Sequence, residues 1–326
     1  MPSAQYLALS RRLEARDQSA VPGMLSLAKA GDADALLKAA ELHMRGMAGP
    51  VDLRAAFKLT GQAAAKGLVE AKRAKAYLTA AGIGTKADPA KARAMLEALA
   101  AEDRFTAVQL AFLGHVRCGE RVKAAPRRLV SADPHIEVVQ GLFSAEECRY
   151  VQLTANPWME PAMIYAADGS GMRDPHRDSD NMAVTPLAED LVIQAVNRCI
   201  AEATGTQHGW GEPLHVLRYR PGQQYRPHHD AHALVPPEKR RIATALIYLN
   251  DAYEGGETHF PEIGVTVRGA IGDMLVFHNL TADKLPDPRM THAGLPVTNG
   301  EKWLATRWIR GSDYFGRRGS SRLASP

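Results

Sequence analysis

The sequence predicts an α+β protein of more than one domain, with helical hairpin repeats first and a β core braced by helices after them. The Ala-rich N-terminal part repeats at a fixed period, which is typical of helical-hairpin arrays. The C-terminal part has short runs of β-branched and aromatic residues between Gly/Pro turns, which favours a sandwich or jelly roll. The length of 326 residues also exceeds the usual size of a single domain.

These patterns divide the chain into four segments. We expect a helical repeat domain over residues 1–115, a basic, Pro-containing linker over 116–134, and a β domain over 135–311. Residues 312–326 form a basic tail rich in Gly and Ser, a composition typical of flexible segments. Contact of this tail with nucleic acid or an acidic partner is the alternative.

Composition indicates a globular protein with neither a membrane nor a nucleic-acid partner. Hydrophobic residues make up 45% of the chain and charged residues 23%. The formal net charge is only +4, and basic residues do not gather in a stripe as in a nucleic-acid binder. No apolar run is long enough to span a bilayer, and residues 1–21 lack the apolar centre of a signal peptide. We therefore expect a cytoplasmic location.

The cysteines fit this expectation. Cys118, Cys148 and Cys199 are odd in number and widely separated, so they do not resemble a disulfide framework. We expect buried or free thiols in a reducing compartment.

The N-terminal repeat has a period of 36 residues. Residues 1–28 precede it as an entry helix, which we expect to break at Pro22-Gly23. From residue 29 onward, a shift of 36 superimposes identical residues: Gly31 on Gly67, Ala35 on Ala71, Ala40 on Ala76, Leu42 on Leu78, Gly46 on Gly82, Asp52 on Asp88, Ala56 on Ala92 and Ala64 on Ala100. Each unit is predicted to be a helix, a Gly-containing turn and a second helix.

This pattern resembles Sel-one-like repeats, which are related to tetratricopeptide repeats. Two units are visible, and a degenerate third begins near Ala107. A short stack of this kind exposes its ends. We expect it to present a surface to a protein partner or substrate; the alternative is that it only caps and stabilises the β domain.

The next segment is predicted to contain a strand, two helices and a long loop. After a strand beginning at His135, Ser144 and Glu147 form a capping box that starts a helix running to about Leu153. Residues 155–185 are rich in Gly and Pro, which predicts either a lid near a substrate or a disordered excursion. Apolar residues at helical spacing predict a helix over 187–204.

Short strands follow. They are expected over residues 214–219, 224–231, 241–249, 257–260, 264–268, 273–278 and 302–310, with a turn at Glu254-Gly-Gly. Seven short strands with Gly/Pro turns predict the jelly roll.

One strand carries a candidate metal motif. In the run from Tyr219 to Asp230, His228 and Asp230 are two residues apart, so on a strand they point to the same side. His292, in Thr-His-Ala-Gly, could supply a second imidazole. Two His and one carboxylate on one face of an ion are the ligand set of non-haem Fe(II) oxygenases. An accidental His-x-Asp on the surface or in the core is the alternative.

Other His residues compete less well for a metal. His229 should point away from this face, and His232 could contact a metal ligand rather than the metal. His259 and His278 alternate with apolar residues and fit core or rim positions.

Lys302 opens a strand pattern whose neighbours are apolar. If its side chain points inward, the ammonium group needs a partner anion, which a bound dicarboxylate would supply. Strand parity places Trp308 on the same face, so it could line the same cavity.

The β domain resembles the prolyl 4-hydroxylase group of 2-oxoglutarate- and Fe(II)-dependent dioxygenases, over roughly residues 136–311. The matching pieces are Tyr219-x-x-Gly222-x-x-Tyr225-x-x-His228-x-Asp230, Arg241-x-x-Thr244, Tyr248-Leu249-Asn250, Gly255-Gly256-Glu257-Thr258-x-Phe260-Pro261, Gly272-Asp273-x-Leu275-x-Phe277, His292-Ala293-Gly294-x-Pro296-Val297 and Gly300-x-Lys302-Trp303. The resemblance implies a double-stranded β-helix, a cupin-like form of the jelly roll.

The resemblance also implies roles for single residues. His228, Asp230 and His292 would bind iron, and Lys302 would hold the C5 carboxylate of 2-oxoglutarate. The hydroxyl groups of Tyr219 and Thr258 would contact the cosubstrate, and Arg241 and Trp308 would border the peptide site.

Alternatives to these implied roles remain open. Tyr219 and Thr258 could fill the barrel with their hydroxyls satisfied internally, and Arg241 could belong to a basic surface turn. Two departures from the family pattern bear on the substrate. Arg177-Asp178-Ser179 stands where Arg-Thr-Ser is usual, and His215 stands where Gln is common.

The implied activity is hydroxylation of a peptidyl residue, most simply proline. Fe(II) would be bound, 2-oxoglutarate and O2 would be consumed, and succinate and CO2 would be released. Ascorbate would act as the rescuing reductant. Two alternatives stay open: a hydroxylase of a free amino acid or small metabolite, and a non-catalytic repeat scaffold with a relic oxygenase domain.

Overall fold

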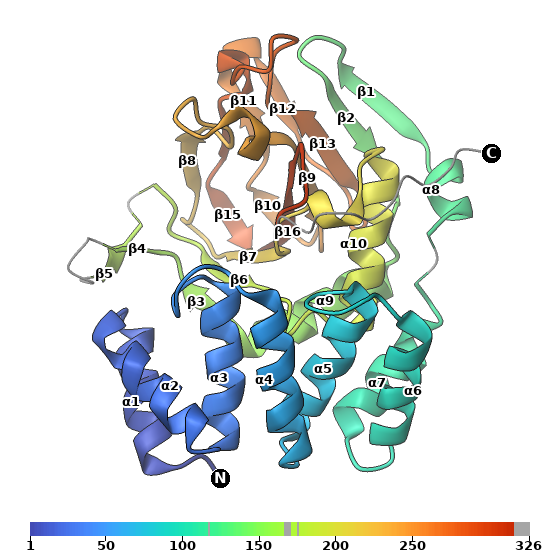
Figure 1. Cartoon of the computed structure of the whole chain (residues 1–326). Coiled ribbons are helices and arrows are strands. Elements are labelled where there is room, and N and C mark those ends of the chain that lie inside the picture. The colour runs from blue at the N-terminus through green and yellow to red at the C-terminus, as the bar shows by residue number, and fades with distance from the viewer. Residues whose placement is uncertain (117, 166–170, 175, 316–326) are drawn as a thin grey trace. The chain divides into compact units, whose positions relative to one another are not determined.

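The computed structural model describes residues 1–326 except 117, 166–170, 175 and 316–326, so most of the expected basic tail lies outside the described residues (Figure 1). The chain forms two compact units. Unit 1 contains Met1–Val116, Met163–Met172 and Thr185–Gln194; unit 2 contains Arg117–Ala162, Arg173–Val184 and Ala195–Pro326.

Unit 1 is built mainly of antiparallel helices that follow one another along the chain. They are α1 (Ala4–Glu14), the short η1 (Gln18–Ala20), α2 (Val21–Lys29), α3 (Ala33–Met44), α4 (Leu53–Ala65), α5 (Val69–Ala81), α6 (Pro89–Leu99) and α7 (Arg104–Leu113). Neighbours in sequence pack on one another, α3 against α4 and α5 against α6. A helical N-terminal region is therefore present as predicted.

Residues related by the 36-residue shift adopt the same local structure. Gly31 and Gly67 have φ of +92° and +91°, a left-handed conformation that glycine adopts without steric cost. The carboxylates of Asp52 and Asp88 cap the N-termini of α4 and α6, each accepting a hydrogen bond from a backbone N–H three residues on. The two 36-residue repeats therefore share their turn and capping geometry.

Small side chains form the contacts between these helices. Ala35, Ala39, Ala63 and Ala71 are almost fully buried in one apolar cluster with larger residues such as Leu42. Because alanine extends only one carbon from the backbone, the helices pack closely.

The entry segment differs from the prediction. Pro22 does not break a helix: it lies in the first turn of α2, where its missing N–H has no intrahelical acceptor. The break falls instead between α1 and α2, at Ala15–Asp17 and η1.

Unit 2 contains two main antiparallel sheets. The larger has the order β1 (Arg127–Ser131), β2 (Ile136–Val139), β13 (Met274–His278), β9 (Arg241–Tyr248), β16 (Lys302–Arg310), β7 (His215–Tyr219), β6 (Asp180–Ala183) and β3 (Glu160–Pro161). The smaller has the order β12 (Val265–Val267), β11 (Thr258–Phe260), β14 (His292–Gly294) and β8 (Tyr225–His228). Two strand pairs are separate: β10 (Tyr253–Gly255) with β15 (Val297–Gly300) in unit 2, and β4 (Met163–Tyr165) with β5 (Gly171–Arg173), of which all but Arg173 belongs to unit 1.

Side chains from both main sheets meet in one core. Tyr248 of β9 and Phe277 of β13 are fully buried in the same cluster as Phe260 of β11. A sheet pair closed around a shared core is the predicted double-stranded β-helix. The α+β fold class is thereby confirmed.

Three helices complete the description: α8 (Glu120–Ala124), α9 (Ala145–Ala155) and α10 (Leu191–Ala203). Single-turn 3-10 helices also occur at η2 (Asn156–Trp158), η3 (His208–Trp210), η4 (Pro237–Lys239), η5 (Pro261–Ile263) and η6 (Pro288–Met290). The predicted capping box is present at α9, where Ser144 and Glu147 each accept a hydrogen bond from the other's backbone N–H.

Two segments in the middle of the chain contain secondary structure that the sequence does not predict. The expected linker contains α8 and the edge strand β1, both within unit 2. The expected loop over 155–185 contains β3 and β6, and β6 pairs with β7 in the large sheet. Short strands of this kind depend on partners far away in sequence, so local patterns do not reveal them.

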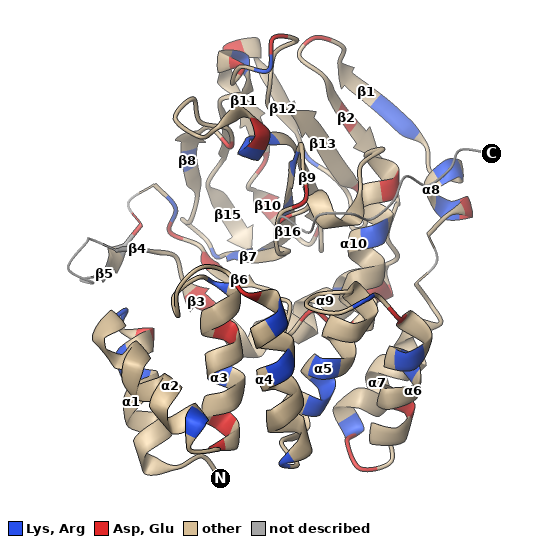
Figure 2. Ribbon diagram, in the orientation of Figure 1, with Lys and Arg blue, Asp and Glu red and all other residues tan. Residues whose placement is uncertain are grey.

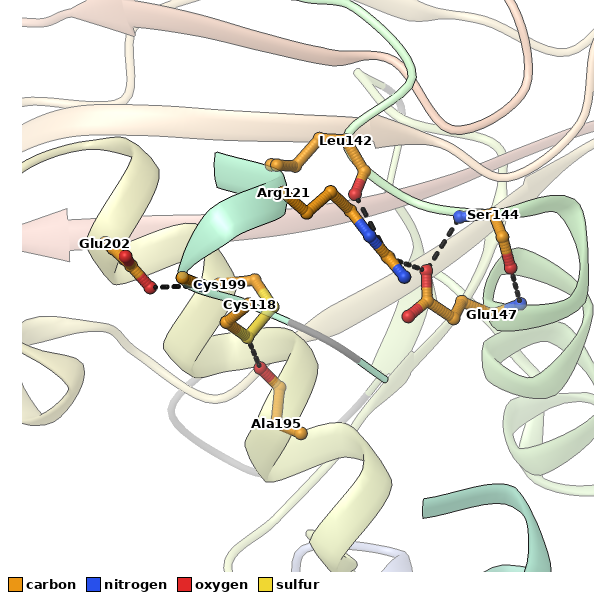
Figure 3. The surroundings of a disulfide bond; sticks show 9 residues. Cys118, Arg121, Leu142, Ser144, Glu147, Ala195, Cys199 and Glu202 are labelled. Atoms are coloured by element: carbon orange, nitrogen blue, oxygen red, sulfur yellow. Dashed lines mark hydrogen bonds and ion pairs between the residues drawn. A yellow bond between two sulfur atoms is a disulfide. The ribbon is translucent and has the colours of Figure 1, made fainter. Parts of the chain in front are cut away.

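The expectation of three free thiols was also wrong. Cys118 and Cys199, which are 81 residues apart, form a disulfide next to Glu202 and Ala195 (Figure 3). Only Cys148 is a free thiol, and its burial raises its pKa to about 12. Among the described helices, none has the length and apolar character needed to cross a bilayer.

Candidate metal and 2-oxoglutarate site

Two imidazoles and one carboxylate meet at one edge of the small sheet. His228 ends β8, and His292 begins the neighbouring strand β14 directly opposite it. Asp230 lies two residues past the end of β8, although the strand was expected to continue to residue 231. The ligand atoms of the three residues all lie within 4.8 Å of one another. Among the described residues, no other group of three His, Cys or acidic side chains converges in this way.

Backbone carbonyls orient both imidazoles. His228 Nδ1 lies 2.8 Å from the Arg226 carbonyl oxygen, and His292 Nδ1 lies 3.0 Å from the Met290 carbonyl oxygen. When each Nδ1 carries the proton and donates to its carbonyl, the Nε2 lone pair is free. Burial and the neighbouring His292 lower the pKa of His228 to about 4, so its ring is neutral at neutral pH.

Asp230 is held as a carboxylate. Burial alone would raise its pKa, but His292, His228, Thr244 and Arg241 together keep the pKa below its usual value. The Thr244 hydroxyl donates to Asp230 Oδ2 at 2.6 Å and accepts from Asn279 at 3.0 Å. Two imidazole nitrogens and an ionised carboxylate are donors that fit Fe(II).

A buried ammonium group lies in the same cavity. Lys302, the first residue of β16, is only 3% exposed, and its Nζ donates to the Gly256 carbonyl oxygen at 2.7 Å. Burial lowers its pKa to about 8. No carboxylate among the described residues lies within ion-pair distance of Nζ. The ammonium group is therefore a charged donor that a bound anion can use.

The cavity around these groups contains most of the predicted site residues. It is lined by Arg177, Leu217, Tyr219, Tyr225, His228, Asp230, Leu246, Thr258, His292, Ala293, Gly294, Lys302, Leu304, Thr306 and Trp308. Tyr219 lies opposite Lys302 across the β7–β16 pair. The Thr258 hydroxyl lies 3.3 Å from the Tyr248 hydroxyl, so it also has a partner within the barrel.

Arg241 is not part of the cavity lining, nor is it in a surface turn. It begins β9, donates twice to the buried Glu212 carboxylate at 2.8 and 2.9 Å, and lies 3.9 Å above the Trp308 ring. Its Nη1 is 4.0 Å from Asp230 Oδ1. Arg241 therefore contacts both the Trp308 ring and the Asp230 carboxylate.

The two departures from the family pattern both lie near this cavity. Arg177 lines it, with its guanidinium 5.4 Å from the centre of the Tyr225 ring. His215 contacts Trp308 edge-on, with ring centres 4.8 Å apart, and burial lowers the pKa of His215 to about 4.

The remaining histidines are placed much as expected. His229 points away from the cavity and lies 2.8 Å from the Thr291 hydroxyl. His259 contacts Thr266, and the His278 ring is tilted by 37° against the His135 ring, with ring centres 4.7 Å apart.

Two residues without a predicted role are in direct contact with the ligands. Tyr225 stacks on His228 with ring centres 3.5 Å apart, and Thr244 bonds Asp230. Both belong to the motif pieces of the family. Their positions in the motif were a signal, but which ligand each contacts depends on strand pairing.

The comparisons with known proteins point to one family. The model of the 2OG-Fe(II) oxygenase superfamily matches residues 214–310. Prolyl 4-hydroxylase 1 of Arabidopsis thaliana is 36% identical over 208 residues, which are 58% of this chain and 74% of that protein. Probable prolyl 4-hydroxylase 3 of the same plant is 30% identical, over 57% of this chain and 72% of its own.

Solved structures give a similar set. The viral collagen prolyl hydroxylase of Paramecium Bursaria Chlorella virus-1, in complex with 2OG, has a TM-score of 0.44 at 28% identity, covering 54% of this chain and 96% of its own. The Pseudomonas putida prolyl-4-hydroxylase has a TM-score of 0.40 at 19% identity, covering 61% and 99%. On the sequence match to the plant enzymes, this chain belongs to the prolyl 4-hydroxylase family of 2-oxoglutarate- and Fe(II)-dependent dioxygenases.

Proposed function

We propose that this protein hydroxylates proline in a peptide or protein, with iron held by His228, Asp230 and His292. The observation that carries the proposal is the convergence of three ligand atoms within 4.8 Å beside the buried Lys302. When bound, Fe(II) supplies the redox chemistry that couples oxidation of 2-oxoglutarate by O2 to hydroxylation of a C–H bond.

The chain's own groups bind and orient. Nδ1 bonds fix the two imidazole rings, and the Thr244 hydroxyl fixes Asp230. We infer that Lys302 binds the C5 carboxylate of 2-oxoglutarate, since its ammonium group is buried without an acidic partner within ion-pair distance. Tyr219 and Thr258 place hydroxyl groups in the same cavity and would add hydrogen bonds to the cosubstrate.

Trp308 and Arg241 are proposed to border the peptide. The Trp308 Nε1–H is buried and, among the described residues, has no acceptor, although the side chain lines the cavity. A buried donor without an acceptor costs about 1–3 kcal/mol. A carbonyl group of the bound peptide would satisfy it, and Arg241 would hold the ring in place from above.

The proposal is tested by anaerobic binding of Fe(II) and 2-oxoglutarate, followed by O2-dependent succinate formation with proline-containing peptides. We expect proline peptides to stimulate succinate release and to gain one oxygen by mass spectrometry. Binding of both cofactors without stimulation by any proline peptide would contradict the proposal and favour a free amino acid or small metabolite.

Four further expectations accompany this function. We infer that ascorbate serves as the rescuing reductant, as is usual for prolyl hydroxylases, and that the helical region is made of Sel-one-like repeats that bind a protein partner. The domain limits at residues 115 and 135 are proposed as well, and limited proteolysis checks them. A cytoplasmic location stays a prediction, although the Cys118–Cys199 disulfide fits an oxidising compartment better; fractionation decides between the two.

A further inference from the structure

Unit 1 contains an open groove that the oxygenase chemistry does not use. It has a volume of about 650 Å³ and lies among α2, α3 and α4. Its titratable lining consists of Lys29, Lys66 and His43, and no Asp or Glu lines it. The groove therefore carries one sign of charge.

The floor of the groove is apolar. Ala28, Leu36 and Ala39 are at most 4% exposed and form its base, while the half-buried Leu25 and Leu59 stand at its sides. A recessed apolar floor with a few polar groups at its rim is suited to binding a side chain from outside. An aliphatic side chain fits this lining.

The ammonium groups at the rim are unpaired. Lys66 Nζ lies beside the α2–α3 turn, since a Cβ on Gly31 would be 3.2 Å from it, and Lys29 ends α2 at the same turn. Among the residues that the structure describes, neither ammonium group has a hydrogen-bond or ion-pair partner. By contrast, Lys38 on α3 pairs with Glu41 and Lys72 on α5 pairs with Glu102.

More unpaired cations continue along the next helices. Arg54 and Lys58 on α4 and Lys75 on α5 likewise have no acidic partner within the described part of the chain. Figure 2 shows basic positions recurring along α4 and α5. The groove and this adjoining stripe together form a surface that attracts negative charge.

We infer that the groove binds an acidic peptide segment of a partner protein, an inference that rests on the proposed partner-binding role of the helical region. An aliphatic side chain of the segment lies on the floor, and a flanking carboxylate pairs with Lys29 and Lys66. A second copy of the same surface is disfavoured because its charges repel. An anionic membrane fits less well, because the apolar residues are recessed rather than presented on a protruding face.

The test uses the full chain and a fluorescein-labelled peptide that alternates short Glu-Leu clusters with Gly and Ser. We expect saturable binding by anisotropy that weakens with added salt. Replacing its Glu by Gln, or its Leu by Ser, should each weaken binding roughly tenfold or more. The double variant Lys29→Glu, Lys66→Glu should weaken it by at least the same factor, and Lys29→Gln, Lys66→Gln by less.

The control is the double variant Lys86→Glu, Lys91→Glu, which makes the same change in net charge at exposed lysines outside the groove. It should bind the peptide like the parent. Equal weakening by both charge-reversed variants overturns the inference, and so does equal binding of the Glu and Gln peptides. Binding to phosphatidylserine vesicles in preference to the peptide overturns it as well.

Turnover of a short proline peptide is measured on the same samples. We expect it to be unchanged in the groove variants. If the parent shows no turnover at all, the proposed hydroxylation is contradicted. The anisotropy data alone then decide whether the groove binds the acidic peptide.

Discussion

The proposed role of Lys302 predicts that 2-oxoglutarate binding depends on pH. Burial lowers the pKa of Lys302 to about 8, so the group is charged below that pH and neutral above it in the free protein. We expect the apparent Kd for 2-oxoglutarate, measured anaerobically with Fe(II), to be flat below pH 8. It should rise above pH 8 by up to about tenfold per pH unit.

Lys302→Met is the matching variant. It should bind 2-oxoglutarate on the order of tenfold to a hundredfold more weakly at neutral pH, because a charge-assisted hydrogen bond is lost. Its residual binding should show no break near pH 8. A break that persists in the variant would mean that another group titrates.

The Thr244 hydroxyl positions the acidic ligand. Thr244→Val keeps the side-chain shape but removes the donor to Asp230 Oδ2. We expect Fe(II) affinity to fall about tenfold to a hundredfold, as for other groups that orient metal ligands. Thr244→Ser retains the hydroxyl and should restore most of the affinity. If Val and Ser variants bind Fe(II) equally well, the hydrogen bond has no such role.

At the level of elements, the repeat predicts equal capping energies. Asp52 and Asp88 cap α4 and α6 in the same way, each at 2.9 Å from its backbone donor. Replacing either by Ala should destabilise the helical unit by about 1 kcal/mol, and Asn should restore most of it. Thermal denaturation of the full chain measures this. A large effect at one site and none at the other would show that the two hairpins are not equivalent.

The sequence predicts some elements much better than others. The span of β16 agrees with the expected residues 302–310 because its apolar and aromatic pattern is continuous along its length. β8 ends at His228, earlier than expected. The short strands β3 and β6 lie where the sequence predicts a loop, because their pairing partners are distant in sequence. α8 was missed because five residues carry too little periodicity to stand out.

The candidate site was predictable for a different reason. His228, Asp230 and His292 form a ligand set that fits iron, and they lie within motif pieces that follow the order of the family. The contact of Thr244 with Asp230 could not be read in the same way, because it requires β9 to pass beside the residue that follows β8. Cys118 and Cys199 likewise carry no mutual signal across 81 residues.

For the whole molecule, the disulfide should add to stability. A bridge closing a loop of this length restricts the unfolded chain and is worth about 3–5 kcal/mol in the chain-entropy model. We expect Cys199→Ser to lower the melting temperature, and a thiol reductant to lower it in the parent but not in the variant. Alkylation of the denatured, unreduced parent should label only Cys148. Labelling of all three cysteines would contradict the pairing.

The central claim is that three residues distant in sequence close around one iron. Anaerobic titration with Fe(II) tests it most directly when the parent is compared with Asp230→Ala, His292→Ala and the control His229→Ala, whose ring points away toward Thr291. We predict one tightly bound equivalent in the parent and in His229→Ala, and none in the other two. Undiminished binding in Asp230→Ala or His292→Ala, or its loss in a folded His229→Ala, would contradict the account.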